Sequence, residues 1–252
     1  MERCIEATRL AHLLLTKDTV AIDKFSILIF IYHGTITKKS WKRSRFKSSI
    51  DAISGNGSGR QQTEGNYFCL RKGQRNYNFS LLKMDPRLVL KQINLFSIAR
   101  RCRSALEIGF NAGHTSALML MSNNDISVEV FDICNHGYTM KCFDKVSEWA
   151  SGRISISPGD SIVSVPKFFE ENSKRKFDLI HVDGCHSLEH ARADLENVIG
   201  GLERGGFIVC DDTQNGGVYR ECKYFISDHG LKEITSFDID STLSHSVAVK
   251  CL

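Results

Sequence analysis

The stretch LEIGFNAGHTS, residues 106–116, decides the fold of this chain. It joins an apolar run that carries the acid Glu107, a turn with glycines at positions 109 and 113, and the start of a helix-forming segment. A strand, a tight glycine turn and a helix N-terminus in this order form the ligand-binding loop of parallel α/β sheets. Dinucleotide-binding loops have the pattern G-x-G-x-x-G, whereas these two glycines stand four residues apart. The stretch therefore predicts an α/β domain with either a binding loop of another kind or a plain strand–helix turn.

Short apolar segments and helical patterns alternate on both sides of this loop, which predicts a Rossmann-like, doubly wound and mostly parallel sheet. The usual strand order for such a sheet is 3-2-1-4-5 around the first strand. Two closing strands at 234–237 and 246–250 have no helix between them, so we expect an antiparallel hairpin at one edge. The other expected strands are 104–108, 128–131, 154–157, 177–182 and 207–210, and the expected helices are 86–98, 114–121, 139–150, 187–199 and 218–229.

The N-terminal part of the chain differs in composition from the rest. Residues 1–80 carry a net charge of +8 and residues 81–252 one of −4, which together give the +4 of the whole chain. The basic run KKSWKRSRFK spans 38–47, and SGNGSGRQQTEG at 54–65 has the composition of a flexible linker. We expect a poorly defined basic extension over 1–80 and one domain over 81–252. A solvated tail is the preferred interpretation of the basic run, and contact with nucleic acid is the alternative.

Cysteine usage indicates a reducing compartment. The chain has 9 cysteines, an odd number, without a C-x-x-C pair or the spacing of a zinc site. Reduced thiols and a cytoplasmic location are therefore expected. The longest apolar run near the start, FSILIFIY at 25–32, is too short to span a bilayer, so no membrane association is expected.

Acidic residues stand at the ends of neighbouring predicted strands. Asp183 follows the fourth strand and Asp211 and Asp212 follow the fifth, beside the strand that carries Glu107. The carboxyl ends of these strands open on the crevice where ligands bind in such sheets. Carboxylates that share a small site need a cation or a proton, and oxygen ligands suit Mg²⁺. Asp183, Asp211 and Asp212 are therefore candidate metal ligands, with a turn cap as the alternative for the last two.

Two further positions carry candidate chemistry. Asp132 ends the second strand, where an acid accepts hydrogen bonds from ribose hydroxyls in nucleotide-binding sheets; an ordinary loop acid is the alternative. Without a metal, Asp183 or His186, three residues further on, could act as a general base. His181 lies inside the fourth strand and is expected in the core.

Residues 86–250 resemble class I S-adenosylmethionine-dependent methyltransferases of the small-molecule O-methyltransferase type. The form E-x-G-x-x-x-G at 107–113 resembles their first motif. V-D-G-x-H at 182–186, a helix bearing Asp194, and G-G-F-I-V-x-D-D at 205–212 resemble the macrocin O-methyltransferase family and, more distantly, catechol O-methyltransferase. The resemblance implies S-adenosylmethionine as cofactor and Mg²⁺ as a candidate cation at Asp183, Asp211 and Asp212. It implies that the cofactor is bound by Glu107, Gly109, Phe110, Asn111, Gly113, His114, Asp132, Asp160, Ser161 and Asp183.

The chain departs from the catechol-type pattern at two places. It has Asp211-Asp212 where those enzymes have Asp-Asn, and no lysine follows the acid of the fourth strand. The identity of the general base, Asp183 or His186, therefore stays open. The resemblance implies methyl transfer to an oxygen of a small-molecule acceptor. The alternatives are an RNA methyltransferase that uses the basic segment and a non-catalytic cofactor-binding protein of the same fold. Related enzymes often dimerise, and no motif here decides whether this chain forms a homodimer.

Overall fold

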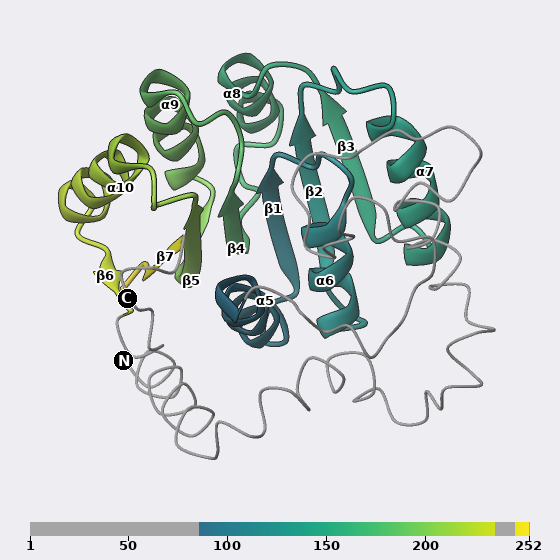
Figure 1. Ribbon diagram of the computed structural model, residues 1–252, viewed down its shortest axis with the longest axis horizontal. Coiled ribbons are helices and arrows are strands. Elements are labelled where there is room, and N and C mark those ends of the chain that lie inside the picture. The colour runs from purple at the N-terminus through teal and green to yellow at the C-terminus, as the bar shows by residue number, and fades with distance from the viewer. Residues whose placement is uncertain (1–85, 235–244, 252) are drawn as a thin grey trace.

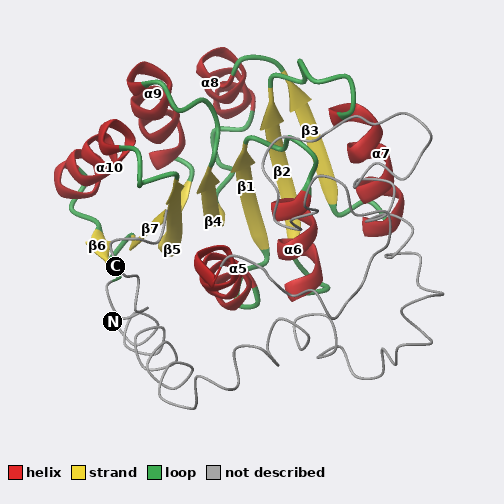
Figure 2. Cartoon of the chain, in the orientation of Figure 1, coloured by secondary structure: helices red, strands yellow, loops and turns green. Residues whose placement is uncertain are grey.

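One mixed sheet organises the chain. The computed structural model describes residues 86–234 and 245–251, so the N-terminal extension, its basic run and the boundary predicted near residue 80 lie outside the described residues. The sheet has seven strands in the order β3-β2-β1-β4-β5-β7-β6. The predicted order 3-2-1-4-5 is therefore confirmed, and Figure 2 shows the arrowheads of β1 to β4 pointing the same way. The strands are β1 Ser104–Ile108, β2 Ser127–Asp132, β3 Ile154–Pro158, β4 Phe177–Val182, β5 Leu202–Asp211, β6 Lys232–Glu233 and β7 His245–Val249.

Helices cover both faces of the sheet and give it two separate cores (Figure 1). The first core joins one face of the strands to α5, α6 and α7, and the second joins the other face to α8, α9 and α10. Because both faces are covered, the central strands are apolar along most of their length. The helices are α5 Pro86–Ala99, α6 His114–Ser122, α7 Thr139–Ala150, α8 Ser161–Glu171, α9 Leu188–Ile199 and α10 Gly216–Asp228.

Helix α8 was not predicted. Its sequence SIVSVPKFFEE starts with serines and β-branched residues and contains Pro166, all of which disfavour a helix locally. Two features outweigh this preference. The Asp160 side chain caps the first turn by accepting from the Ile162 N–H at 3.0 Å. Val165 is completely buried and Phe168 packs on the same core, so burial of one face stabilises the helix.

The C-terminal edge is antiparallel, as predicted. β7 lies between β5 and β6 and pairs antiparallel with both, through Phe207↔Val249 on one side and Lys232↔Val249 on the other. The first strand of the predicted pair begins earlier than expected, at Lys232, and residues 235–244 lie outside the described residues.

The described cysteines are all free thiols. Four of them, at positions 102, 142, 210 and 222, are buried in the two cores. Among the described helices, none is long and apolar enough to cross a membrane.

A buried acid on α9 is the least favourable group in the second half of the fold. Asp194 is 0% exposed, and neither carboxylate oxygen has a well-formed hydrogen bond to a described residue. Burial raises its pKa to about 6, although the nearby Ser161 side chain acts in the opposite direction. The acid packs against the loop after β4, because a Cβ on Gly184 would lie 2.9 Å from its Oδ2.

Replacement of Asp194 by Asn is expected to stabilise the protein above pH 6. The folded state holds the Asp194 proton up to a pKa of about 6, whereas the unfolded chain loses it near 3.8. The wild type therefore loses stability as the pH rises from about 4 to about 6, by about 2–3 kcal/mol, and D194N does not. Urea denaturation at pH 4 and pH 8 measures this difference. D144N, a change at an exposed acid of α7, is the control, and equal pH profiles for D194N and wild type would contradict the assignment.

Candidate active site

A row of buried polar side chains crosses the centre of the sheet. Glu107 on β1 and His181 on β4 are register partners. Asp211 ends β5 two residues beyond Val209, the partner of His181 on the next strand, so it lies on the same face. The His181 ring stands between the acids, with Nδ1 3.4 Å from Glu107 Oε1 and Nε2 3.7 Å from Asp211 Oδ2. All three side chains are buried and face protein rather than solvent.

Helices α5 and α6 close the two ends of this row. Lys91 of α5 forms an ion pair through its Nζ with Asp211 Oδ1, and its side chain is only 10% exposed. At the other end, the Ser116 hydroxyl of α6 donates a hydrogen bond to Glu107. We call Ser116, Glu107, His181, Asp211 and Lys91 the buried row. It ties both helices to the three central strands.

Charges alternate along the buried row. Burial opposes the charged form of His181, but the neighbouring carboxylates of Asp211 and Glu107 outweigh burial and raise its pKa to about 10. Burial also opposes ionisation of Asp211, and His181 with Lys91 outweigh it and hold the pKa of that carboxyl well below its ordinary value. Burial acts against the Lys91 ammonium as well, yet Asp211 raises the Lys91 pKa. At neutral pH the row is a chain of ionised partners.

A second group lies at the carboxyl ends of β4 and β5. Asp183 follows β4, His186 lies in the same loop before α9, and Asp212 follows β5. His186 Nε2 is 2.7 Å from Asp212 Oδ2 and 3.9 Å from Asp183 Oδ1. Asp212 has a φ of 53°, a backbone conformation uncommon outside glycine. We call Asp183, His186 and Asp212 the outer group, because each side chain is partly exposed.

The outer group contains a charged imidazole. Hydrogen bonding to Asp183 and Asp212 raises the pKa of His186 to about 10, so this ring holds its proton at neutral pH. Burial and the Asp211 charge raise the pKa of Asp183 to about 6, against the opposing effect of His186. In this arrangement Asp183 is the better-placed proton acceptor of the two predicted bases.

The glycine loop touches the outer group directly. Gly109 and Gly113 have φ angles of 94° and 77°. A Cβ on Gly109 would lie 2.0 Å from the carbonyl oxygen of Asp183, and the Asp183 N–H donates to the Ile108 carbonyl at 2.9 Å. Glycine at position 109 therefore allows the loops after β1 and β4 to approach each other.

Asp132 holds the glycine loop from the end of β2. Its Oδ2 accepts from the backbone N–H groups of Phe110 and Asn111 at 2.7 and 2.8 Å, and its Oδ1 accepts from Cys134 N–H at 2.6 Å. A carboxylate offers about four acceptor positions, of which these N–H groups use three. The Tyr138 hydroxyl donates to Asn111 Oδ1 at 2.7 Å, a support that the sequence did not reveal.

The remaining predicted cofactor residues flank this loop. His114 begins α6, and burial lowers its pKa to about 4, so its ring is neutral. Asp160 caps α8 and Ser161 is its first residue. The Gly159 N–H donates to the Asp132 carbonyl at 2.9 Å, which brings the Asp160 turn next to the glycine loop.

The structure divides the three predicted metal ligands between the two groups. Asp183 and Asp212 belong to the outer group, whereas Asp211 belongs to the buried row. The sequence also did not identify Lys91. Lys91, Leu95 and Ile98 recur at the spacing of one helix face, so a lysine among buried apolar positions of α5 was the available signal.

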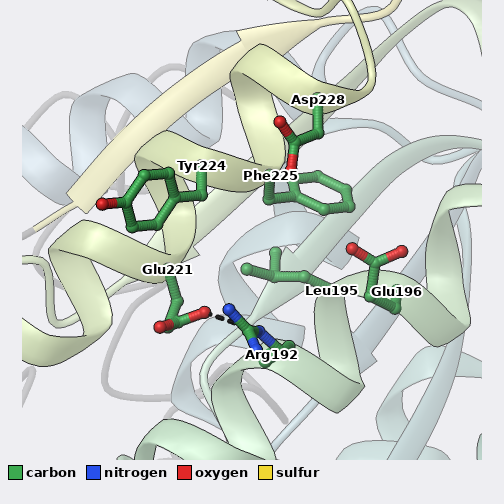
Figure 3. Close-up of a pocket in the computed structure, with 7 residues that line it drawn as sticks. All are labelled: Arg192, Leu195, Glu196, Glu221, Tyr224, Phe225 and Asp228. Atoms are coloured by element: carbon green, nitrogen blue, oxygen red, sulfur yellow. Dashed lines mark hydrogen bonds and ion pairs between the residues drawn. The ribbon is translucent and has the colours of Figure 1, made fainter.

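A hollow between α9 and α10 lies apart from these residues (Figure 3). It has a volume of about 340 Å³, and Arg192 and Glu221 pair across it at 2.8 Å. None of the predicted site residues lines it, so it is not a candidate for the reaction predicted from the sequence. Its lining is completed by Leu195, Glu196, Tyr224, Phe225 and Asp228.

A family profile agrees with the site geometry. The profile of the family described as "Methyltransferase domain" matches residues 106–213. This range contains the glycine loop, Asp132 and the three acids at the ends of β4 and β5. Residues 106–213 thus form a methyltransferase domain, and the resemblance to class I methyltransferases is confirmed.

Solved methyltransferases share the fold. CalS11, a TDP-rhamnose 3'-O-methyltransferase of calicheamicin biosynthesis, is 16% identical with a TM-score of 0.52, over 64% of this chain and 77% of that one. An O-methyltransferase from Bacillus cereus in complex with SAH is 12% identical with a TM-score of 0.51, over 89% and 97%. The SAH-bound Podospora anserina methyltransferase PaMTH1 is 13% identical with a TM-score of 0.52, over 66% and 80%. Comparison with curated proteins gives no match. Identities this low establish the fold, and the activity has to be argued from the site.

Replacement of Gly109 by Ala is expected to separate the two loops. The new Cβ would collide with the Asp183 carbonyl, and the φ of 94° adds backbone strain. We expect a loss of about 3 kcal/mol or more of folding free energy. G152A is a matched control, since Gly152 has a φ of 82° but nothing within 4 Å of its Cβ position, and should cost about 1 kcal/mol. Equal losses in urea denaturation would contradict the close approach of the loops.

Proposed function

We propose that the methyltransferase domain binds S-adenosylmethionine at the glycine loop and transfers its methyl group to an oxygen nucleophile of a small molecule. The observation that carries this proposal is the direct contact between the glycine loop and the loop of Asp183. A cofactor on the first loop and an acceptor beside the second would be neighbours. Methyl transfer by direct displacement requires such alignment and the removal of one proton.

Features of the glycine loop support the cofactor end of this proposal. Backbone N–H groups in the first turn of α6 have no partner within the helix and suit a carboxylate, such as that of the methionine moiety. The Asp132 carboxylate, which keeps an acceptor position beside the loop, suits a ribose hydroxyl. Glu107 acts differently from a ligand-binding acid: it is 1% exposed and supports the loop from within the buried row.

Asp183 is the proposed general base at the acceptor end. Its side chain is 24% exposed and lies next to Gly109, so it can meet both the acceptor and solvent. His186 and Asp212 flank it from the two neighbouring loops. The charged His186 ring would orient Asp183 and balance the acids rather than remove the proton.

A divalent cation fits the outer group by donor chemistry. One ligand atom from each of Asp183, His186 and Asp212 lies within 4.8 Å of the others, and all three residues are partly exposed. Carboxylate and imidazole ligands with room for water suit Mn²⁺, and Mg²⁺ accepts the carboxylates. A bound cation would lower the pKa of an acceptor hydroxyl.

RNA methylation is the less favoured function. The sequence argument against it was the lack of a lysine at the strand ends, and α5 does supply Lys91 to the acids. That lysine, however, is buried against Asp211 and does not reach the partly exposed outer group where an acceptor would lie. The small-molecule acceptor therefore remains the proposal.

Calorimetric titration of the full chain tests the cofactor. S-Adenosylmethionine and S-adenosylhomocysteine are expected to bind with micromolar affinity, and NAD is the control ligand. Titrations with Mg²⁺ and with EDTA separate the cofactor from the cation. Failure of both adenosyl ligands to bind to folded protein would overturn the proposal.

Replacement of Asp183 by Ala is expected to abolish turnover while cofactor affinity changes by less than about threefold. The reason is that Asp183 would act on the acceptor and contributes only its backbone to the contact with the glycine loop. Release of S-adenosylhomocysteine, assayed against a panel of catechols and hydroxylated sugars, measures turnover. D144N, at an exposed position of α7, should behave as wild type. A D183A variant that retains turnover would remove Asp183 from the mechanism.

A further inference from the structure

Protein groups occupy both oxygens of Asp211. The Lys91 ammonium pairs with Oδ1, and the Asp212 N–H donates to the same oxygen at 2.6 Å. The His181 ring faces Oδ2 at 3.7 Å. The Asp211 side chain is completely buried among these groups. A cation could coordinate Asp211 here only by displacing Lys91 or His181.

The outer group is arranged differently. The side chains of Asp183, His186 and Asp212 are 24%, 52% and 22% exposed. Their contacts are mainly with one another, and Gln214 adds a hydrogen bond to Asp212 Oδ1 at 2.9 Å. These ligand atoms are therefore open to water, whereas those of Asp211 are enclosed.

We propose that Lys91 is a positioning residue that withholds Asp211 from cations, so that a divalent cation is held by Asp183, His186 and Asp212. This inference rests on the proposed function, because it concerns the cation of the same site. It makes the fifth-strand acids unequal: Asp211 is a structural partner of α5, and Asp212 is the ligand.

Removal of the Lys91 charge has an unusual predicted effect. In K91M, Asp211 loses its ion pair and becomes a fourth acid beside the outer group, since Asp212 is its chain neighbour. Cation affinity should then rise. A purely structural role of Lys91 predicts the opposite, because loss of a packing partner would loosen the site and weaken binding. The direction of the change therefore separates the two roles.

Titration of the full-length protein with Mn²⁺, followed by electron paramagnetic resonance of the free ion, tests the proposal. We expect K91M to bind Mn²⁺ about 10-fold or more tightly than wild type, and K91R to match wild type within about threefold. H186Q and D212N should each weaken binding about 10-fold or more. K167M removes a lysine charge from the exposed surface of α8, where the side chain is 70% exposed, and should leave the affinity unchanged.

The double variant K91M/D211N keeps the test decisive if K91M does not fold, because it removes both members of the buried pair together. With Asp211 outside the cation site, its Mn²⁺ affinity should stay within about threefold of wild type. A loss of 10-fold or more would show that Asp211 is a ligand and would overturn the proposal. Unchanged or weaker binding in folded K91M would overturn it too.

Binding of S-adenosylhomocysteine, measured on the same samples, separates this inference from the proposed function. A wild type that binds S-adenosylhomocysteine but no Mn²⁺ at millimolar concentration overturns the inference alone. A folded wild type that binds no S-adenosylhomocysteine overturns the proposed function, while the Mn²⁺ pattern still decides the role of Lys91.

Discussion

The buried charges of Glu107, His181, Asp211 and Lys91 are the constraint on which the site depends. Each carries a charge in a place without solvent, so each is tolerable only because its neighbour carries the opposite charge. Loss of one member would leave an uncompensated buried charge, a far larger penalty than the loss of a surface pair. The row therefore requires β1, β4 and β5 to keep their order and register, with α5 packed across them.

The site residues are placed by their short distance from this row along the chain. Gly109 comes two residues after Glu107, Asp183 two residues after His181, and Asp212 directly after Asp211. The charges inside the sheet thus fix the starting points of the three loops that carry the chemistry. Asp132 adds a second fixed point through its hydrogen bonds to the glycine loop. A loop that must approach another backbone as closely as Gly109 approaches Asp183 needs such support.

Local sequence was sufficient for the regular elements where hydrophobic pattern and flanking residues agreed. The bounds of β1, β4 and α7 were predicted without error, since each is an apolar or amphipathic segment between clear breaks. The same reasoning did not find α8, because its proline and β-branched residues disfavour a helix locally. Only packing of its apolar face on the second core outweighs that preference.

The sequence by itself determined the parallel sheet, the glycine loop after β1 and the convergence of acids at the ends of β4 and β5. These follow from periodicity and from the rule that parallel strands present their carboxyl ends on one edge. The tertiary structure decided which acids are enclosed and which are open, because that depends on Lys91, which lies far from them in the sequence on another helix. It also made His181 the link between Glu107 and Asp211, since a strand residue gains such partners only when its neighbours in the sheet are known. Ion pairs between distant segments leave no periodic signal in the sequence, and this is why they could be seen only in the folded chain.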